Sequence, residues 1–140
     1  MKKLISIVTP TFNEKDNIKS LCLAISAQME KLNYEYEHIV IDNCSNDGTI
    51  ETLRELTKTF KNLKVIVNSR NFGHIRSPVH GMFQATGEAV ILMMSDFQDP
   101  IDLIPKYITE WENGNKVVMA QKSTSDENFM LHYFKKIFYK

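Results

Sequence analysis

The stretch Ala89-Val90-Ile91-Leu92-Met93-Met94-Ser95-Asp96-Phe97-Gln98-Asp99-Pro100 joins an apolar run to a cluster of polar side chains. The run that ends at Met94 predicts a buried strand, and the two carboxylates and the amide follow where that strand stops. Open α/β sheets bind ligands at the carboxyl ends of their strands. Hard divalent cations prefer oxygen ligands such as these. The stretch therefore predicts a metal–phosphate site at the edge of an α/β sheet.

The rest of the chain alternates between strand-like and helix-like patterns. Apolar side chains recur at helical spacing between short β-rich runs, which predicts βαβ units and a mostly parallel sheet with flanking helices. We expect strands at 4–8, 37–42, 63–67, 89–94 and 116–120. We expect helices from Glu14 to about Lys31, after a cap at Asp47, from Ser77-Pro78 and between Pro100 and Asn113-Gly114.

Composition excludes several classes of protein. The chain has 140 residues, enough for one domain with a core, and its formal net charge is zero. A nucleic-acid binder would carry a basic excess, so we expect no nucleic-acid partner. The longest apolar run is far shorter than the roughly 18 residues of a membrane-spanning helix. Cys22 and Cys44 have no metal-ligand or disulfide spacing, which favours a cytoplasmic protein with reduced thiols.

Polar clusters follow three of the expected strands. They comprise residues 9–14, 42–49 and 95–99. Each cluster alone is typical of a turn or a helix cap. In a parallel sheet, however, all three would converge on one edge. Neither G-x-G-x-x-G nor G-x-x-x-x-G-K-[ST] is present, so a cation and helix N-termini would have to neutralise any bound phosphate.

Four motifs in register resemble the family 2 glycosyltransferases of the GT-A fold. They are Pro10-Thr11-Phe12-Asn13-Glu14, Ile41-Asp42-Asn43-Cys44-Ser45-Asn46-Asp47-Gly48-Thr49, Arg70-Asn71-Phe72-Gly73 and Asp96-Phe97-Gln98-Asp99-Pro100. Within that family the chain is most similar to the polyprenyl-phosphate sugar transferases that use dolichol or undecaprenyl phosphate. The resemblance spans about residues 4–120, and it implies a GT-A fold with a Rossmann-like sheet.

The resemblance also implies roles for individual residues. Asp96 matches the last acid of the D-x-D motif, so it is the expected catalytic and metal-binding residue, and Gln98 can join the shell of a Mg²⁺ or Mn²⁺ ion. Residues at the other motifs match the contacts to the nucleotide and sugar. The expected nucleotide- and sugar-binding residues are Pro10, Thr11, Phe12, Glu14, Asp42, Asn43, Arg70, Gly73, Ser95 and Asp96.

Two positions depart from the family pattern. Asn43 stands where the second motif usually has a second Asp, and Met94 stands where D-x-D has its first acid. Asp96, Gln98 and diphosphate oxygens could still hold the ion, with Asp99 either as a compensating acid or as a cap of the next helix. His74 and His80 are expected on the surface or in packing, with contact to substrate as the less favoured alternative.

We therefore expect an inverting glycosyltransferase that moves a sugar from a UDP- or GDP-type donor to a polyprenyl phosphate for cell-envelope or polysaccharide synthesis. Residues 1–122 would form the GT-A catalytic domain. Residues 123–140, aromatic and basic, would begin a segment that contacts the cytoplasmic face of the membrane or a second copy of the chain, and the architecture would be truncated there. The alternatives are a decayed, non-catalytic nucleotide-sugar-binding module and a nucleotidyltransferase, which would need a glycine-rich basic signature after the first strand.

Overall fold

The computed structural model of the chain describes residues 2–121, in which strands and helices alternate along the sequence. The expected interface segment, 123–140, lies outside these residues. The strands are β1 (Leu4–Thr11), β2 (Glu35–Asp42), β3 (Leu63–Val67) and β4 (Ala89–Leu92). The helices are α1 (Lys15–Met29), α2 (Thr49–Thr59), α3 (Gly73–Phe83) and α4 (Leu103–Glu112).

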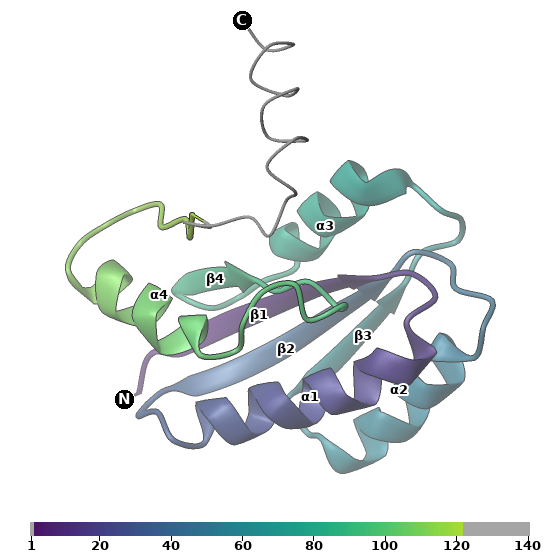
Figure 1. Cartoon of the computed structure of the whole chain (residues 1–140), viewed down its shortest axis with the longest axis horizontal. Helices are drawn as coiled ribbons and strands as arrows, with labels where there is room; N and C mark the ends of the chain where they lie inside the picture. Colours follow the sequence, from purple (N-terminus) through teal and green to yellow (C-terminus); the bar gives the residue numbers. More distant parts are fainter. Residues whose placement is uncertain (1, 122–140) are drawn as a thin grey trace, which may run out of the picture.

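The strands form one parallel sheet in the order β3-β2-β1-β4 (Figure 1). Thr11 pairs with Asp42, and Val8 pairs with Leu92. The carboxyl ends of β1, β2 and β4 therefore lie at the same edge of the sheet. The expected α/β class with a parallel sheet is confirmed.

The two central strands, β1 and β2, are buried on both faces over most of their length, as strands of parallel sheets are. The main apolar cluster joins β1 to α1, α2 and α4, with Ile5, Ile7 and Leu21 fully buried. Helix α3 covers the opposite face (Figure 1). A Cβ atom at Gly81 would lie 2.9 Å from both Ile41 Cγ2 and Val8 Cγ1. Glycine is therefore required where α3 approaches the sheet most closely.

Two predicted elements are wrong. Residues 116–120 form no strand, and Val117 and Met119 are 80% and 85% exposed. A strand is stable only beside a partner, and this segment lies beside β4 and α4 without pairing with β4. Helix α3 begins at Gly73 rather than at Ser77, so that Pro78 lies inside it.

Smaller differences concern the ends of elements. Strand β1 continues through Pro10 to Thr11, and β4 ends at Leu92 rather than at Met94. Within residues 2–121, no helix has the length and apolarity needed to cross a lipid bilayer.

Candidate functional site

A cleft of about 400 Å³ lies at the carboxyl edge of the sheet, between the loops that follow β1, β2 and β4 and the first turns of α3. Most of the predicted site residues line it. These residues are Pro10, Thr11, Phe12, Glu14, Asn43, Gly73, Ser95 and Asp96. The structure thus brings together clusters that are far apart in the sequence, while Asp42, Arg70 and Gln98 are not among the lining residues.

The loops after β1 and β2 are joined by hydrogen bonds. The Asn13 backbone N–H donates to Ser45 Oγ (2.8 Å), and the Glu14 N–H donates to Thr49 Oγ1 (2.9 Å). The Lys15 N–H donates to Asp47 Oδ2 (3.1 Å). These bonds satisfy backbone donors at the start of α1, which are otherwise left without partners. Side chains of the loop after β2 therefore bind the backbone N–H groups at the start of α1.

The electrostatics of Asp47 agree with this capping role. Burial alone would raise the pKa of Asp47. Hydrogen bonds from the Thr49 side chain and backbone, and from the Lys15 backbone, outweigh that effect and hold the pKa below its ordinary value. Asp47 therefore stays ionised where α1 and α2 begin.

Asp42 is fully buried at the end of β2. Its carboxylate accepts the Ser45 backbone N–H (2.9 Å) at Oδ1 and the Ser45 hydroxyl at Oδ2. In this arrangement Asp42 shapes the loop that carries Asn43, and it does not face the cleft.

Asn43 joins the loop after β2 to the segment that precedes α3. Its Nδ2 donates to Asn71 Oδ1 (2.8 Å) and to Gly73 O (3.4 Å). Its Oδ1 accepts the Phe72 backbone N–H (2.9 Å) and Asn68 Nδ2 (3.2 Å). Both ends of the amide are thus engaged, and a carboxylate could not make the two donated bonds. Asn43 holds the Asn71–Gly73 wall of the cleft in place.

The loop after β4 provides Met94, Ser95 and Asp96 to the cleft. Asp96 Oδ1 accepts the Gln98 backbone N–H (3.1 Å), and no described residue hydrogen-bonds to its Oδ2. The Gln98 side chain is exposed. Within residues 2–121 there is no group of three or more His, Cys, Asp or Glu side chains that could hold a metal ion. A metal ion at this place would have Asp96 as its protein ligand, and oxygen atoms of a bound ligand would fill its other coordination positions.

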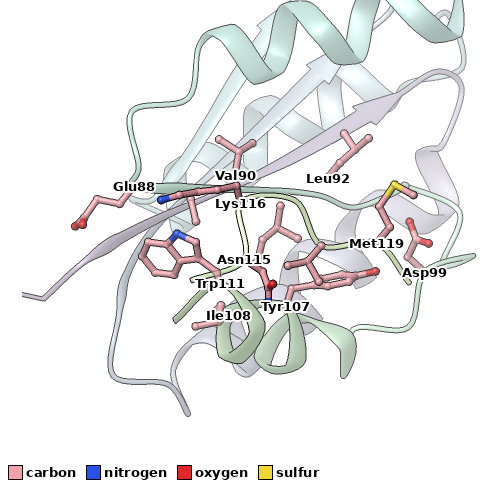
Figure 2. Close-up of a pocket in the computed structure, with 13 residues that line it drawn as sticks. Glu88, Val90, Leu92, Asp99, Tyr107, Ile108, Trp111, Asn115, Lys116 and Met119 are labelled. Atoms are coloured by element: carbon pink, nitrogen blue, oxygen red, sulfur yellow. The ribbon is translucent and has the colours of Figure 1, made fainter. Parts of the chain in front are cut away.

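Asp99 does not compensate for Met94 inside the cleft. Its Oδ2 accepts the Met94 backbone N–H (3.3 Å), and the residue lines a different cavity of about 630 Å³. Figure 2 shows side chains that line that cavity: Val90 and Leu92 come from β4, and Tyr107 and Trp111 come from helix α4. The two acids of the Asp96–Asp99 turn therefore belong to different cavities.

Backbone strain marks the same edge of the sheet. Asn13, Cys44 and Phe97 have φ values of 56°, 69° and 59°, and they are the residues other than glycine with positive φ in the described part of the chain. Each lies in a loop that follows one of the strands at the cleft. Left-handed conformations at non-glycine residues persist where surrounding contacts enforce them, often at functional sites.

Helix α3 provides site residues that the sequence analysis did not assign. His74, Ser77 and Pro78 line the cleft because the helix starts at Gly73, directly after the Arg70–Phe72 motif. Arg70 instead lies over the Phe72 ring, 4.9 Å from its centroid. The signal that could have located His74 was the glycine before it, which has a φ of 83° at the helix start.

Thr11 lies in the cleft lining and is 3% exposed. Its Oγ1 is the buried side-chain polar atom without a hydrogen-bond partner among residues 2–121. Leaving a buried hydroxyl unpaired costs roughly 1–3 kcal/mol. A ligand or water molecule that reached this hydroxyl would satisfy it.

Comparisons with known proteins show the family to which the chain is similar. The model of "Glycosyl transferase family 2" matches residues 6–138. A putative glycosyltransferase, CsbB, from Bacillus subtilis is 33% identical over 137 residues, covering 98% of this chain and 42% of the relative. A dolichol-phosphate mannosyltransferase from Pyrococcus furiosus is 31% identical over 118 residues, covering 84% and 33%. The chain thus spans less than half the length of these curated relatives.

Solved structures share the fold. TarS 1–349 from S. aureus superposes with a TM-score of 0.66 at 24% identity, covering 91% of this chain and 40% of that one. The mannosyltransferase PcManGT from Pyrobaculum calidifontis, in complex with GDP-Man and Mn²⁺, gives a TM-score of 0.57 at 23% identity, covering 69% and 28%. The expected GT-A fold is confirmed.

Proposed function

The chain belongs to glycosyl transferase family 2, and from this premise we propose that it forms the donor-binding part of an inverting enzyme. The enzyme transfers a sugar from a UDP- or GDP-type nucleotide sugar to a polyprenyl phosphate, for cell-envelope or polysaccharide synthesis. The observation that carries the proposal is the single cleft into which Phe12, Glu14, Asn43 and Asp96 converge from three loops. The name of the dolichol-phosphate mannosyltransferase relative supports the acceptor class.

Asp96 and the diphosphate oxygens of the donor would hold a Mg²⁺ or Mn²⁺ ion. When bound, the ion stabilises the negative charge that builds on the leaving diphosphate. The PcManGT structure contains Mn²⁺ and GDP-Man, which supports this class of cofactor and donor. Glu14 and Phe12 line the side of the cleft formed by the loop after β1, where we place the nucleoside.

A polyprenyl-phosphate acceptor simplifies the chemistry. Its phosphate is already ionised, so the attacking oxygen needs no general base, whereas a hydroxyl acceptor would need one. Such an acceptor also brings the site to a lipid surface, and we place the working enzyme at the cytoplasmic face of the membrane. Residues 123–140 are the candidate contact to that surface or to a second copy of the chain.

The first test is calorimetric titration of the chain with UDP and with GDP, each with and without Mn²⁺. We expect one nucleotide to bind in a metal-dependent manner and Asp96→Ala to abolish that dependence. Asp102→Ala removes an exposed carboxylate outside the cleft and should behave as wild type. Failure of the folded wild-type chain to bind either nucleotide would overturn the donor-site proposal.

The second candidate function is a decayed nucleotide-sugar-binding module, which Met94 in the cleft lining favours. Met94→Asp restores the acid of the D-x-D pattern next to Asp96. A large gain in metal-dependent nucleotide affinity would support decay. An unchanged affinity would support a site in which Asp96 suffices.

A further inference from the structure

The proposed cleft is poor in positive charge. A nucleotide diphosphate carries several negative charges, and the carboxylates of Glu14 and Asp96 add to them. Met94 is apolar, so the wall near Asp96 has one ligand fewer for a cation than the D-x-D pattern offers. Burying phosphate charge without a counter-charge is costly. A positive side chain in the cleft would therefore add to the counter-charge of the ion held by Asp96.

His74 is the one basic side chain among the residues that line the cleft. It is exposed, and it makes no hydrogen bond or ion pair with any other residue between 2 and 121. The other basic residues nearby point elsewhere. Arg70 stacks on Phe72, while Arg76 and His80 line a separate cavity.

The backbone around His74 favours an anion as well. His74 is the second residue of α3, an 11-residue helix, and the N-terminus of a helix carries a partial positive charge. The N-cap residue of α3 is Phe72, whose side chain has no oxygen to accept a backbone N–H. Asn71 Oδ1 accepts the first N–H of the helix, that of Gly73 (2.8 Å), and no described side chain accepts the N–H groups of His74 and Ile75.

A second observation at this cleft is a buried hydroxyl group without a hydrogen-bond partner. Thr11, which lines the same cleft, is 3% exposed, and its Oγ1 has no hydrogen-bond partner in the described part of the chain. The first turn of α3, the exposed imidazole of His74 and the buried Thr11 thus line one cleft.

We propose that His74, in the first turn of α3, binds the diphosphate of the nucleotide-sugar donor and provides counter-charge on the wall of the cleft that this helix forms. This inference rests on the proposed function, because it assumes a nucleotide diphosphate in the cleft. It assigns the positive charge to a protein side chain, in addition to the ion at Asp96.

The test compares His74→Gln, His74→Lys and the wild-type chain in titrations with UDP and GDP, without metal and with Mn²⁺. A hydrogen bond between charged groups at a partly open site is worth about tenfold in affinity. We expect His74→Gln to weaken nucleotide binding about tenfold, with and without Mn²⁺, and His74→Lys to restore most of it. Affinity for the phosphate-free nucleosides uridine and guanosine should not change.

His80→Gln is the matched control, because it removes an exposed imidazole from the same helix outside the cleft. Equal affinities of wild type and His74→Gln would overturn the inference and leave the donor site intact. An effect confined to the Mn²⁺ titrations would also overturn it, since His74 would then act as a metal ligand. If wild type binds neither nucleotide, the donor site and this inference fail together.

Discussion

The two ends of the sheet differ in one buried polar group each. Glu37 at the amino end is fully hydrogen-bonded by the protein, and Thr11 at the carboxyl end is not. At the amino end, Glu37 of β2 is 4% exposed, and its carboxylate accepts the Ser6 hydroxyl (2.6 Å), the Thr86 N–H (2.7 Å) and the Lys64 ammonium. At the carboxyl end, Thr11 Oγ1 has no partner among the described residues, and the loops contain left-handed residues.

This difference separates the end of the sheet that stabilises the fold from the end that we propose to bind the donor. Buried polar groups are usually satisfied by the protein, and exceptions call for an explanation. Glu37 of β2 is hydrogen-bonded to β1, to β3 and to the turn before β4, so its hydrogen bonds stabilise the fold. The cleft keeps an unpaired hydroxyl and strained loops, features that a bound ligand can compensate.

The amino end should give the largest effect on stability. Glu37→Ala removes the acceptor for Ser6, Thr86 and Lys64 and should lower the free energy of unfolding by about 3 kcal/mol, because the buried Ser6 hydroxyl and the Thr86 N–H lose their acceptor. Urea denaturation measures the change. Glu55→Ala, which removes an exposed partner of Lys58, should cost less than about 1 kcal/mol. A loss of similar size in both variants would contradict the assignment.

The same network predicts a pH dependence. Burial alone would raise the pKa of Glu37, but hydrogen bonds from Lys64, Ser6 and Thr86 outweigh it and lower the pKa from 4.5 to about 2. The native state therefore binds the proton less readily than the unfolded state. This contribution is fully present above pH 4.5 and is lost as the pH falls towards 2, by about 3 kcal/mol in total.

Glu37→Gln removes the titrating group, so its difference in stability from wild type should shrink across that window. Parallel acid-unfolding curves for the two proteins would show that Glu37 has an ordinary pKa in the native state.

At the carboxyl end, Asn43 should have the largest effect. Asn43→Ala removes bonds to Asn71, Phe72, Gly73 and Asn68, and should cost about 2 kcal/mol of stability. Because Asn71 and Gly73 line the cleft, nucleotide affinity should fall as well. Asn46→Ala is the control, since its exposed side chain makes no hydrogen bond with the described residues. Wild-type affinity in Asn43→Ala would show that the cleft does not depend on this amide.

The fold was largely predictable because it depends on local patterns. Apolar runs and helical spacing located β1 to β4, and parallel topology placed their loops at one edge. The start of α3 was mispredicted, since Ser77-Pro78 is typical of a helix N-terminus. Asn43 binds the Phe72 N–H from a distant loop and helps to set the earlier start. Local sequence contains no sign of that contact.

The sequence predicted which loops form the site, but it did not predict how the side chains on those loops are oriented. Asp42 has the expected position, yet Ser45 turns its carboxylate into the protein. Arg70 and Phe72 stack on each other, which leaves Arg70 outside the cleft lining. His74 was undervalued because its place in the first turn of α3 depends on the mispredicted helix start. Side-chain partners formed across the fold decide these outcomes.

The smallest and most discriminating effect concerns two threonines on one strand. Thr9 and Thr11 lie two residues apart on β1, both buried and on the same face. The Thr9 hydroxyl is hydrogen-bonded to His38 Nε2 at 2.9 Å, whereas Thr11 Oγ1 has no partner among the described residues. Valine keeps the shape of threonine and replaces the hydroxyl by a methyl group.

Thr9→Val should therefore lower the free energy of unfolding by about 1 kcal/mol, because it leaves the buried His38 ring unpaired. Thr11→Val should raise it by about 1 kcal/mol without ligand, because it removes an unsatisfied buried hydroxyl, and it should weaken nucleotide binding. Urea denaturation and calorimetry measure the two quantities. Opposite signs of the two changes in the free energy of unfolding would show that the Thr11 hydroxyl destabilises the ligand-free protein. Destabilisation by both substitutions would mean that the Thr11 hydroxyl is already satisfied in the free protein, and the contrast between the two ends would disappear.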